Sequence, residues 1–318
     1  MQTSPSACIS IDMDGIGCYT SIHGIPHPTT PHSPPDPIFA IALERFLALF
    51  AELGVQATFF CIGRDLEDPT HAELFRQAAA AGHELASHSY NHLYNLRSQS
   101  RSIIRDEIER TSALLTRISG ERVVGFRTPG YNLSAPIARE LTSQGYLYDS
   151  SLFPCPPYYA AKGLIMASMR LTGRRSGSQM NLPQTLLSPL EPYVADPDRP
   201  WRPAAGGGLW EIPMCVVPGV RFPIIGTSLH LLGGHRFRAL MPTLAWRHRS
   251  LFNLEFHGID LLDTTDEGVP TQLGAHQPDL GVPLEQKLNT YREVFTALRE
   301  RYTFRTLRDA VLLLDRSR

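Results

Sequence analysis

The 318-residue sequence has few cysteines, no long hydrophobic run and no excess of either charge. Its five cysteines are odd in number and include no CxxC pair, so they argue against a disulfide framework and favour reduced thiols in a cytoplasmic protein. No run of 18 apolar residues predicts a transmembrane helix, and the N-terminal stretch lacks the basic and apolar regions of a secretory signal. Because the net charge is −1, the chain as a whole is not expected to bind nucleic acid electrostatically.

The composition is that of a globular protein with a full core, since hydrophobic residues make up 42% of the chain and charged residues 19%. The charge is unevenly spread along the chain. Residues 156–250 hold eleven Lys and Arg against four Asp and Glu, a net charge of +7, so the rest of the chain carries −8. We interpret this basic segment as a lid or a region that faces the substrate.

Strand-like and helix-like segments alternate along the first half of the chain. Short apolar or aromatic runs indicate strands, and longer segments with apolar residues at helical spacing indicate helices that end at glycines. This order predicts a parallel sheet or barrel whose active site lies at the carboxyl ends of the strands. The expected strands are residues 8–13, 56–63, 84–87, 122–130 and 146–151, and the expected helices are residues 38–54, 70–81, 102–120 and 135–145.

The alternation is lost after residue 151. Residues 154–206 are rich in Pro, Gly and Ser, and only residues 160–171 indicate a short helix, so we expect a long irregular insertion here. Regular elements resume with strands at 209–217 and 251–258, a helix near 283–301, a strand at 303–307 and a final helix.

Two acids follow the first predicted strand. Asp12 and Asp14 are one residue apart, so both side chains point to the same side of an extended chain. At the carboxyl end of a parallel strand, one of them could bind a metal while the other accepts a proton. Alternatively, the pair caps a surface loop, as an isolated pair of this kind often does.

Two histidines, His88 and His92, stand four residues apart directly after the short strand 84–87. On a helical turn this spacing places both imidazoles on one face, as a divalent metal requires. Such a pair also arises by chance among twelve histidines, but the β–α alternation puts this one at the same sheet edge as the two acids. Two histidines and one aspartate fill three positions of a zinc site and leave the fourth for water.

Three more polar residues fall at predicted strand ends: Arg127, Asp149 and His257. Arg127 is either the partner in a surface ion pair, which contributes little to stability, or the group that keeps Asp12 ionised. An acid and a histidine at two further strand ends of one barrel favour a catalytic role over a structural one.

Together these motifs resemble those of the polysaccharide deacetylases of the NodB-homology type, carbohydrate esterase family 4. The most specific match is GHELASHSYNH (82–92), which resembles the family's metal-binding motif. The resemblance covers residues 8–155 and resumes at 251–263. Its other parts are SIDMDG (10–15), ATFFCIG (57–63), FRTPG (126–130), YDSS (148–151) and FHG (256–258).

The resemblance implies a distorted (β/α) barrel with fewer than eight regular strands and a bound divalent metal, most commonly Zn²⁺. The metal ligands it implies are Asp14, His88 and His92. Asp12 would be the general base, with Arg127 as its partner.

The remaining implied roles concern the general acid and the oxyanion. His257 would be the general acid, and Asp149 would tune it. Gly130 takes the place of the residue whose backbone N–H helps to form the oxyanion hole, and the family's usual tyrosine follows here as Tyr131. The sequence also departs from the family at Gly258, where a proline usually follows the histidine.

The implied function is a metal-dependent hydrolase that removes an N-acetyl group from an amino sugar, with residues 1–318 as a single catalytic domain. Without an export signal, the expected substrate is an intracellular glycan, nucleotide sugar or lipid-linked sugar, and the basic segment favours an anionic one. The alternatives are a deformylase or amidase acting on a lipid-linked or non-sugar amide, and a non-catalytic metal-dependent carbohydrate-binding protein.

One further segment bears on location. LIMASMRLTGRRSG (164–177) could lie on an anionic membrane with its apolar residues inserted, which would make the protein peripheral at the inner membrane face. The alternative is a solvated lid. The sequence indicates no nucleic-acid partner and is compatible with a homo-oligomer.

Overall fold

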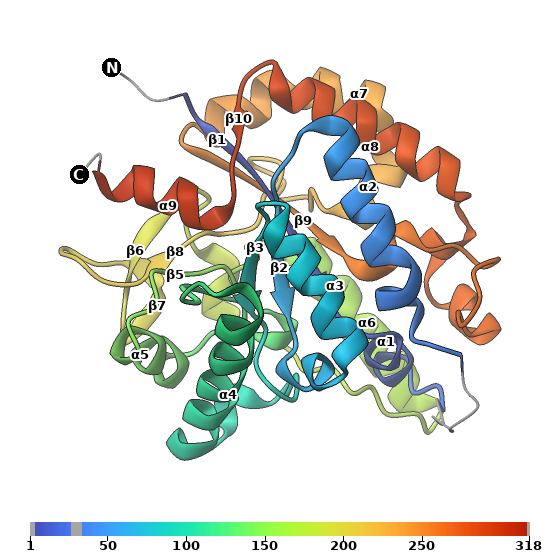
Figure 1. Ribbon diagram of the computed structural model, residues 1–318, viewed down its shortest axis with the longest axis horizontal. Coiled ribbons are helices and arrows are strands. Elements are labelled where there is room, and N and C mark those ends of the chain that lie inside the picture. Colours follow the sequence, from blue (N-terminus) through green and yellow to red (C-terminus); the bar gives the residue numbers. More distant parts are fainter. Residues whose placement is uncertain (1–3, 27–33, 317–318) are drawn as a thin grey trace.

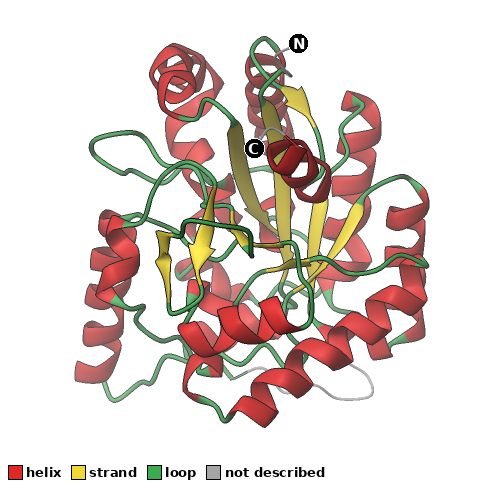
Figure 2. Ribbon diagram, turned by 90° about the vertical axis from the view of Figure 1, so that its left-hand side faces the viewer, coloured by secondary structure: helices red, strands yellow, loops and turns green. Residues whose placement is uncertain are grey.

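The computed structural model describes residues 4–26 and 34–316; residues 1–3 of the N-terminal stretch lie outside this range. A sheet of mostly parallel strands runs through the middle of the molecule, and helices cover its outside (Figures 1 and 2). The first strand, β1 (Ser6–Met13), is buried along its whole length because it has strand neighbours on both sides. The other strands are β2 (Thr58–Cys61), β3 (Glu84–Ser87), β4 (Gly125–Phe126), β5 (Tyr148–Asp149), β6 (Tyr193–Asp196), β7 (Arg199–Pro203), β8 (Trp210–Glu211), β9 (Leu251–His257) and β10 (Thr303–Phe304).

Strands β1 to β5 lie side by side in chain order, and each pairs in parallel with the next. β8 continues this parallel series next to β5, and β6 and β7 extend it as an antiparallel ribbon. On its other side, β1 pairs in parallel with β9, in a register that sets Asp12 opposite His257. The chain therefore brings the end of its first strand next to the end of a strand 245 residues later.

The residues that follow β8 join the two sides of the sheet. The backbone N–H of Met214 donates to the carbonyl of Leu152, just beyond β5, and that of Cys215 donates to the carbonyl of Asn253 in β9, both at 3.0 Å. The sheet thus curls into a distorted barrel whose regular strands are short. The sequence-based prediction of such a barrel is confirmed.

The helices begin and end close to where the sequence predicts. The second helix ends at Gly54, whose φ of +60° stops it, and the fourth begins at Ser100, whose side chain accepts a hydrogen bond from the N–H of Ile103. A π-helical turn (Ile38–Ala42) precedes the second helix. The helices are α1 (Ile16–Ile22), α2 (Leu43–Leu53), α3 (Pro69–Ala80), α4 (Arg101–Ser119), α5 (Ala135–Ser143), α6 (Pro156–Leu171), α7 (Gly226–Arg247), α8 (Leu284–Arg299) and α9 (Leu307–Arg316).

The segment after β5 is more regular than the sequence predicts. Residues 154–206 contain all of α6 and the ribbon of β6 and β7. Helix α6 forms because two prolines occupy its first turn, where no backbone donor is needed, and good helix formers follow them. Helix α7 was not predicted from the sequence. Its pattern is interrupted by Gly233, where φ is +72° and the helix kinks, and by Pro242.

None of the helices within residues 4–26 and 34–316 combines the length and the hydrophobicity needed to cross a bilayer. All five cysteines are free. The thiol of Cys18 is partly exposed, and the other four are buried.

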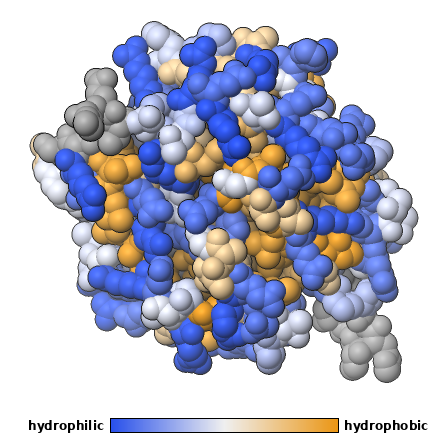
Figure 3. All heavy atoms as spheres, turned by 45° about the horizontal axis from the view of Figure 1, so that its top comes forward, coloured by the Kyte–Doolittle hydropathy of each residue, from blue (hydrophilic) through white to orange (hydrophobic). Residues whose placement is uncertain are grey.

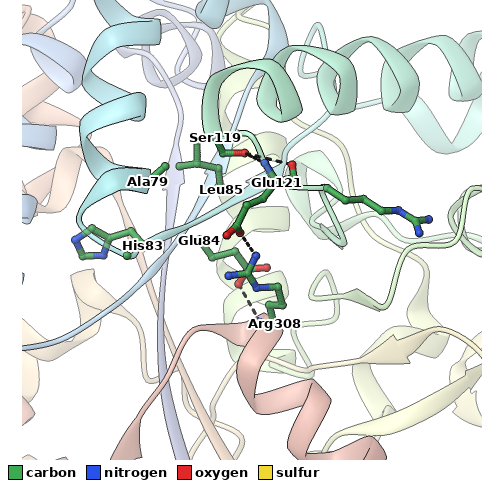
Figure 4. Close-up of a pocket in the computed structure, with 9 residues that line it drawn as sticks. Ala79, His83, Glu84, Leu85, Ser119, Glu121 and Arg308 are labelled. Carbon is green, nitrogen blue, oxygen red and sulfur yellow. Dashed lines mark hydrogen bonds and ion pairs between the residues drawn. The ribbon is translucent and has the colours of Figure 1, made fainter.

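A small polar pocket lies at the end of the barrel where the parallel strands begin (Figure 4). Its central acid is Glu84, the first residue of β3, which accepts hydrogen bonds from the hydroxyls of Thr58 at 2.7 Å and Tyr148 at 2.9 Å and from the N–H of Arg308 at 2.9 Å. Burial raises the pKa of Glu84, and these hydrogen bonds counteract the rise. Because every contact joins two elements of the fold, we assign this cluster to stability.

Candidate metal centre

The candidate site lies at the opposite end, where the parallel strands finish. Asp12 is the next-to-last residue of β1, and Asp14 follows the strand, so the alternation of an extended chain sends both carboxylates to the same side. Both side chains are buried, with exposed fractions of 2% for Asp12 and 6% for Asp14. They do not cap a surface loop.

His88 and His92 lie in the loop that follows β3. The prediction of a helical turn here is wrong, because Ser89 and His92 adopt positive φ angles of 63° and 54° and the chain between them is not helical. The loop is held instead by Glu107 of α4, whose carboxylate accepts hydrogen bonds from the N–H groups of Tyr90 at 3.0 Å and Asn91 at 2.8 Å. Both imidazoles nevertheless reach the carboxylate of Asp14.

Asp14, His88 and His92 converge on one point. Oδ1 of Asp14 lies 3.4 Å from Nε2 of His88 and 3.3 Å from Nε2 of His92, and all three candidate ligand atoms lie within 4.8 Å of one another. Ligands about 2.0–2.2 Å from a tetrahedral ion lie roughly 3.3–3.6 Å apart, so the spacing fits a single divalent metal. Oδ1 of Asp14 and Nε2 of His92 are buried and have no hydrogen-bond partner among the described residues, as expected of atoms that bind an ion.

The surroundings orient the ring of His88 and shift the pKa values of His92 and Asp14 toward the forms that bind metal. Nδ1 of His88 lies 2.8 Å from the carbonyl oxygen of Arg127, which fixes the ring with Nε2 toward Asp14. Burial lowers the pKa of His92 to about 4, so its ring is neutral at pH 7. Burial alone would raise the pKa of Asp14, but His92 and His88 hold it well below its usual range.

Asp12 lies beside this cluster, and Arg127 holds its carboxylate from the barrel interior. The guanidinium Nη1 donates to Oδ1 of Asp12 at 2.5 Å, while Oδ2 lies 3.9 Å from Nε2 of His88. Arg127 is completely buried in the barrel interior, where its other N–H groups donate to the hydroxyl of Ser10 and to the hydroxyl and carbonyl of Ser150. The arginine is thus a core residue that orients one carboxylate, and it is not at the surface.

His257 ends β9 on the other side of Asp12. Its Nε2 lies 3.2 Å from the hydroxyl of Tyr131, and this hydroxyl donates to Oε1 of Glu255 at 2.8 Å. Glu255 is fully buried and lies 3.6 Å from Nη1 of Arg127. Burial alone would lower the pKa of His257, but Glu255 and Asp12 raise it to about 9.

Glu255 is the residue that sequence reasoning missed. Burial raises its pKa to about 7, although Arg127 opposes the rise. One signal was present in the sequence: Glu255 stands two residues before His257 in a strand whose other residues are Leu, Phe and Asn253, so the two side chains share one face.

Asp149 lies apart from this group. Its carboxylate accepts hydrogen bonds from the N–H of Ser151 at 2.9 Å and the hydroxyl of Ser151 at 2.8 Å, and Glu211 is its charged neighbour. The carboxylate that Tyr131 connects to His257 is that of Glu255.

Gly130 and Tyr131 form a tight turn after β4. Both have positive φ angles, of 62° and 64°, and the N–H of Tyr131 donates to the carbonyl of Thr128 at 3.0 Å. A Cβ atom on Gly130 would lie 3.0 Å from the ring of Tyr94, so the turn leaves little room for a side chain here. Both residues line the same cavity as Asp12, Asp14, His88 and His257.

Comparison with known proteins identifies relatives of this arrangement. Residues 40–148 match the family model described as polysaccharide deacetylase. A peptidoglycan deacetylase-like protein of Gibberella zeae is 30% identical over 121 residues, which are 36% of this chain and 34% of the relative. The match therefore spans about a third of the length of that curated relative.

Solved structures resemble nearly the whole chain. A "probable polysaccharide deacetylase" of Pseudomonas aeruginosa PAO1 is similar over 98% of this chain and 91% of its own, with a TM-score of 0.57 and 15% identity. The allantoinase Puue is similar over 96% of this chain and 89% of its own, also with a TM-score of 0.57, at 17% identity. At these identities the likeness establishes the fold.

Proposed function

The chain belongs to the polysaccharide deacetylase family, and from this premise we propose that it is a metal-dependent hydrolase that removes an N-acetyl group from an amino sugar. The observation that carries the proposal is the convergence of a candidate Asp–His–His metal site with a second, arginine-anchored carboxylate. An intracellular glycan, nucleotide sugar or lipid-linked sugar fits the free cysteines, which favour a reducing cytoplasm. An anionic substrate fits the basic segment 156–250.

Each residue of the site has a part in amide hydrolysis. A divalent ion, Zn²⁺ by the donor set, would supply Lewis-acid chemistry at Asp14, His88 and His92 by polarising the amide carbonyl and acidifying the attacking water. Asp12 accepts the proton from this water, and Arg127 keeps its carboxylate oriented for the transfer.

The second half of the reaction requires an acid on the other side of the substrate. His257 donates a proton to the leaving nitrogen, without which the tetrahedral species returns to the amide. The backbone N–H of Gly130, at the turn that lines the cavity, would stabilise the developing negative charge on oxygen, since the N–H of Tyr131 is engaged by Thr128. The products are a free amine and acetate.

The experiment that tests this proposal measures acetate release from a panel of N-acetylated amino sugars, nucleotide sugars and glycan oligomers. We expect release by protein loaded with Zn²⁺ and loss of release after chelation, with recovery when the metal returns. If metal-loaded, folded protein releases nothing from any member of the panel, the deacetylase proposal is wrong. The non-catalytic carbohydrate-binding alternative would then be favoured if the same sugars bind.

A second candidate function is hydrolysis of another amide, such as a formamide on a lipid-linked sugar or a non-sugar amide. The apolar character of the cavity above the site favours it. Formate in place of acetate would identify a deformylase.

Replacing Glu255 with Gln is expected to lower the pKa of His257 and so to move the alkaline limb of the pH profile of kcat/KM to lower pH. The carboxylate stabilises the protonated imidazole, whose pKa is about 9 in the folded protein, so its removal lets the acid form disappear sooner as the pH rises. Rates measured from pH 5 to 10 check this, with Glu109→Gln on the exposed face of α4 as control. An unshifted alkaline limb would exclude His257 as the general acid tuned by Glu255.

A further inference from the structure

The candidate metal centre opens into a cavity of about 530 Å³. Its walls come from α6, from the loop before α7 and from the start of α7, which stand over the carboxyl ends of the strands. Most of the wall is apolar, with Tyr158, Ile165, Met166, Phe222, Ile225 and Leu231 as its main side chains. The volume is typical of a small-molecule site.

Several hydroxyl groups in this wall are already engaged within the protein. Ser176 donates to the carbonyl of Ile22 at 2.8 Å, and Ser228 donates to the carbonyl of Pro223 at 2.8 Å. Thr227 donates to the carboxylate of Asp260 at 3.2 Å. Apart from the candidate metal ligand Asp14, the buried lining groups without a hydrogen-bond partner among the described residues, the hydroxyls of Tyr19 and Tyr94 and Nε2 of His23, lie outside α6 and α7. A sugar ring needs partners for most of its hydroxyls, so the wall formed by α6 and α7 suits an apolar group better than a second sugar.

The mouth of the cavity carries large apolar side chains that face solvent. Ile165 is 51% exposed, Phe222 40% and Leu231 76%, and the three belong to different segments of the chain. On the face shown in Figure 3, hydrophobic and hydrophilic groups are mixed. The mouth is distinct because its exposed apolar residues are continuous with an apolar interior, so an alkyl chain passing through it would cover both.

One lysine among the described residues lines the same cavity. Lys162 of α6 is three residues before Ile165, and its ammonium lies 6.0 Å from the centre of the Tyr159 ring. It forms no ion pair with a carboxylate of the described residues. Burial lowers the pKa of Lys162 to about 8, so its ammonium is still mostly protonated at pH 7 but has lost much of its hydration. An anionic group on the ligand would restore the lost stabilisation.

Resting on the function proposed above, we propose that the substrate is an anionic amphiphile. Its amide lies at the metal centre, its alkyl chain occupies the apolar cavity between α6 and α7, and its negative group meets Lys162. A lipid-linked amino sugar has this chemistry, whereas an extended polysaccharide does not. The apolar residues at the mouth then meet the part of the chain that extends beyond the cavity.

Binding of alkyl phosphates to the full-length protein tests the cavity without turnover. Titration calorimetry with butyl, hexyl, octyl and decyl phosphate below their micelle concentrations should show affinity rising roughly fourfold for each added methylene until the cavity is full. Inorganic phosphate controls for binding of the head group to the metal. Equal affinity along the series would overturn the proposal.

Two alanines of α6 offer matched variants. Ala161 lines the cavity and Ala167 does not, and both are exposed, so neither Ala161→Trp nor Ala167→Trp should unfold the helix. We expect Ala161→Trp to weaken decyl phosphate at least tenfold and Ala167→Trp to leave it unchanged. Lys162→Met should weaken decyl phosphate but not the neutral decyl maltoside. An equal response of the two tryptophan variants would contradict the proposal.

Turnover separates this inference from the function on which it rests. If Zn²⁺-loaded protein releases acetate equally from methyl and decyl glycosides of N-acetylglucosamine, the amphiphile proposal fails and the deacetylase proposal stands. If alkyl phosphates bind with the expected dependence on length but no amide is hydrolysed, the cavity assignment stands and the activity fails. If Ile165→Asp changes the oligomeric state in sedimentation, the mouth is a contact between copies of the chain and the proposal is wrong.

Discussion

Replacing Asp12 with Asn is expected to reduce kcat/KM for amide hydrolysis by about a hundredfold to ten-thousandfold while the protein stays folded and keeps its metal. The amide of Asn can still accept the hydrogen bond from Arg127 but cannot take a proton from water. The metal ligands are other residues, so their distances from one another need not change.

The stability of the Asp12→Asn variant shows whether a loss of activity reflects the missing base or unfolding of the protein. Removing one partner of a buried ion pair commonly costs about 3–5 kcal/mol, but Glu255 lies 3.6 Å from the same Arg127 nitrogen and offers a second carboxylate. We therefore expect a smaller change in the free energy of unfolding, measured by urea denaturation. Asp106→Asn on the exposed face of α4 serves as control. If Asp12→Asn retains activity within about threefold while metal content and folding are normal, Asp12 is not the base.

Replacing His88 with Ala is expected to abolish both metal binding and hydrolysis. The variant removes one of three protein ligands and also the ring that Arg127 orients through its carbonyl. Loss of one ligand from a three-residue site leaves too few donors to hold a catalytic ion tightly. Elemental analysis of purified protein should show about one ion per chain in the parent and little in the variant.

Thermal unfolding gives an independent measure of the same loss. A ligand that binds only the folded state at a hundred times its Kd adds about 2.7 kcal/mol to stability, so Zn²⁺ should raise the Tm of the metal-free parent by several degrees and leave that of His88→Ala unchanged. His235→Ala, an exposed histidine of α7, is the matched control and should behave as the parent. Full metal content in His88→Ala would remove the candidate ligand set from consideration.

The sequence allowed the barrel and the positions of Asp12 and Asp14 to be predicted because both follow from local rules. Strand alternation fixes which side chains share a face, and parallel order fixes where strand ends meet. The spacing of His88 and His92 correctly predicted that the two rings lie together, but the helical turn inferred from it is absent. Two left-handed residues and the buried Glu107, not a helix, bring the two rings together.

Other parts of the site depend on contacts that no local pattern encodes. Tyr131 meets Glu255 across 124 residues, and the approach of their side chains is set by how β4 and β9 close around the barrel interior. Asp149 illustrates the converse. Its strand was placed correctly, but its carboxylate is engaged by Ser151 two residues later. Helix α7 escaped detection because glycine and proline interrupt a segment that packing against α8 and β9 keeps helical.

The pairing of β1 with β9 also has a consequence for synthesis of the chain on the ribosome. β1 emerges first, but one of its two edges finds its partner only when residues 251–257 have left the exit tunnel. Until then the nascent chain carries an open apolar strand edge, of the kind that chaperones bind and that aggregates when uncovered. The catalytic end of the barrel is therefore completed late in synthesis, although Asp12 and Asp14 are among the first residues to be made.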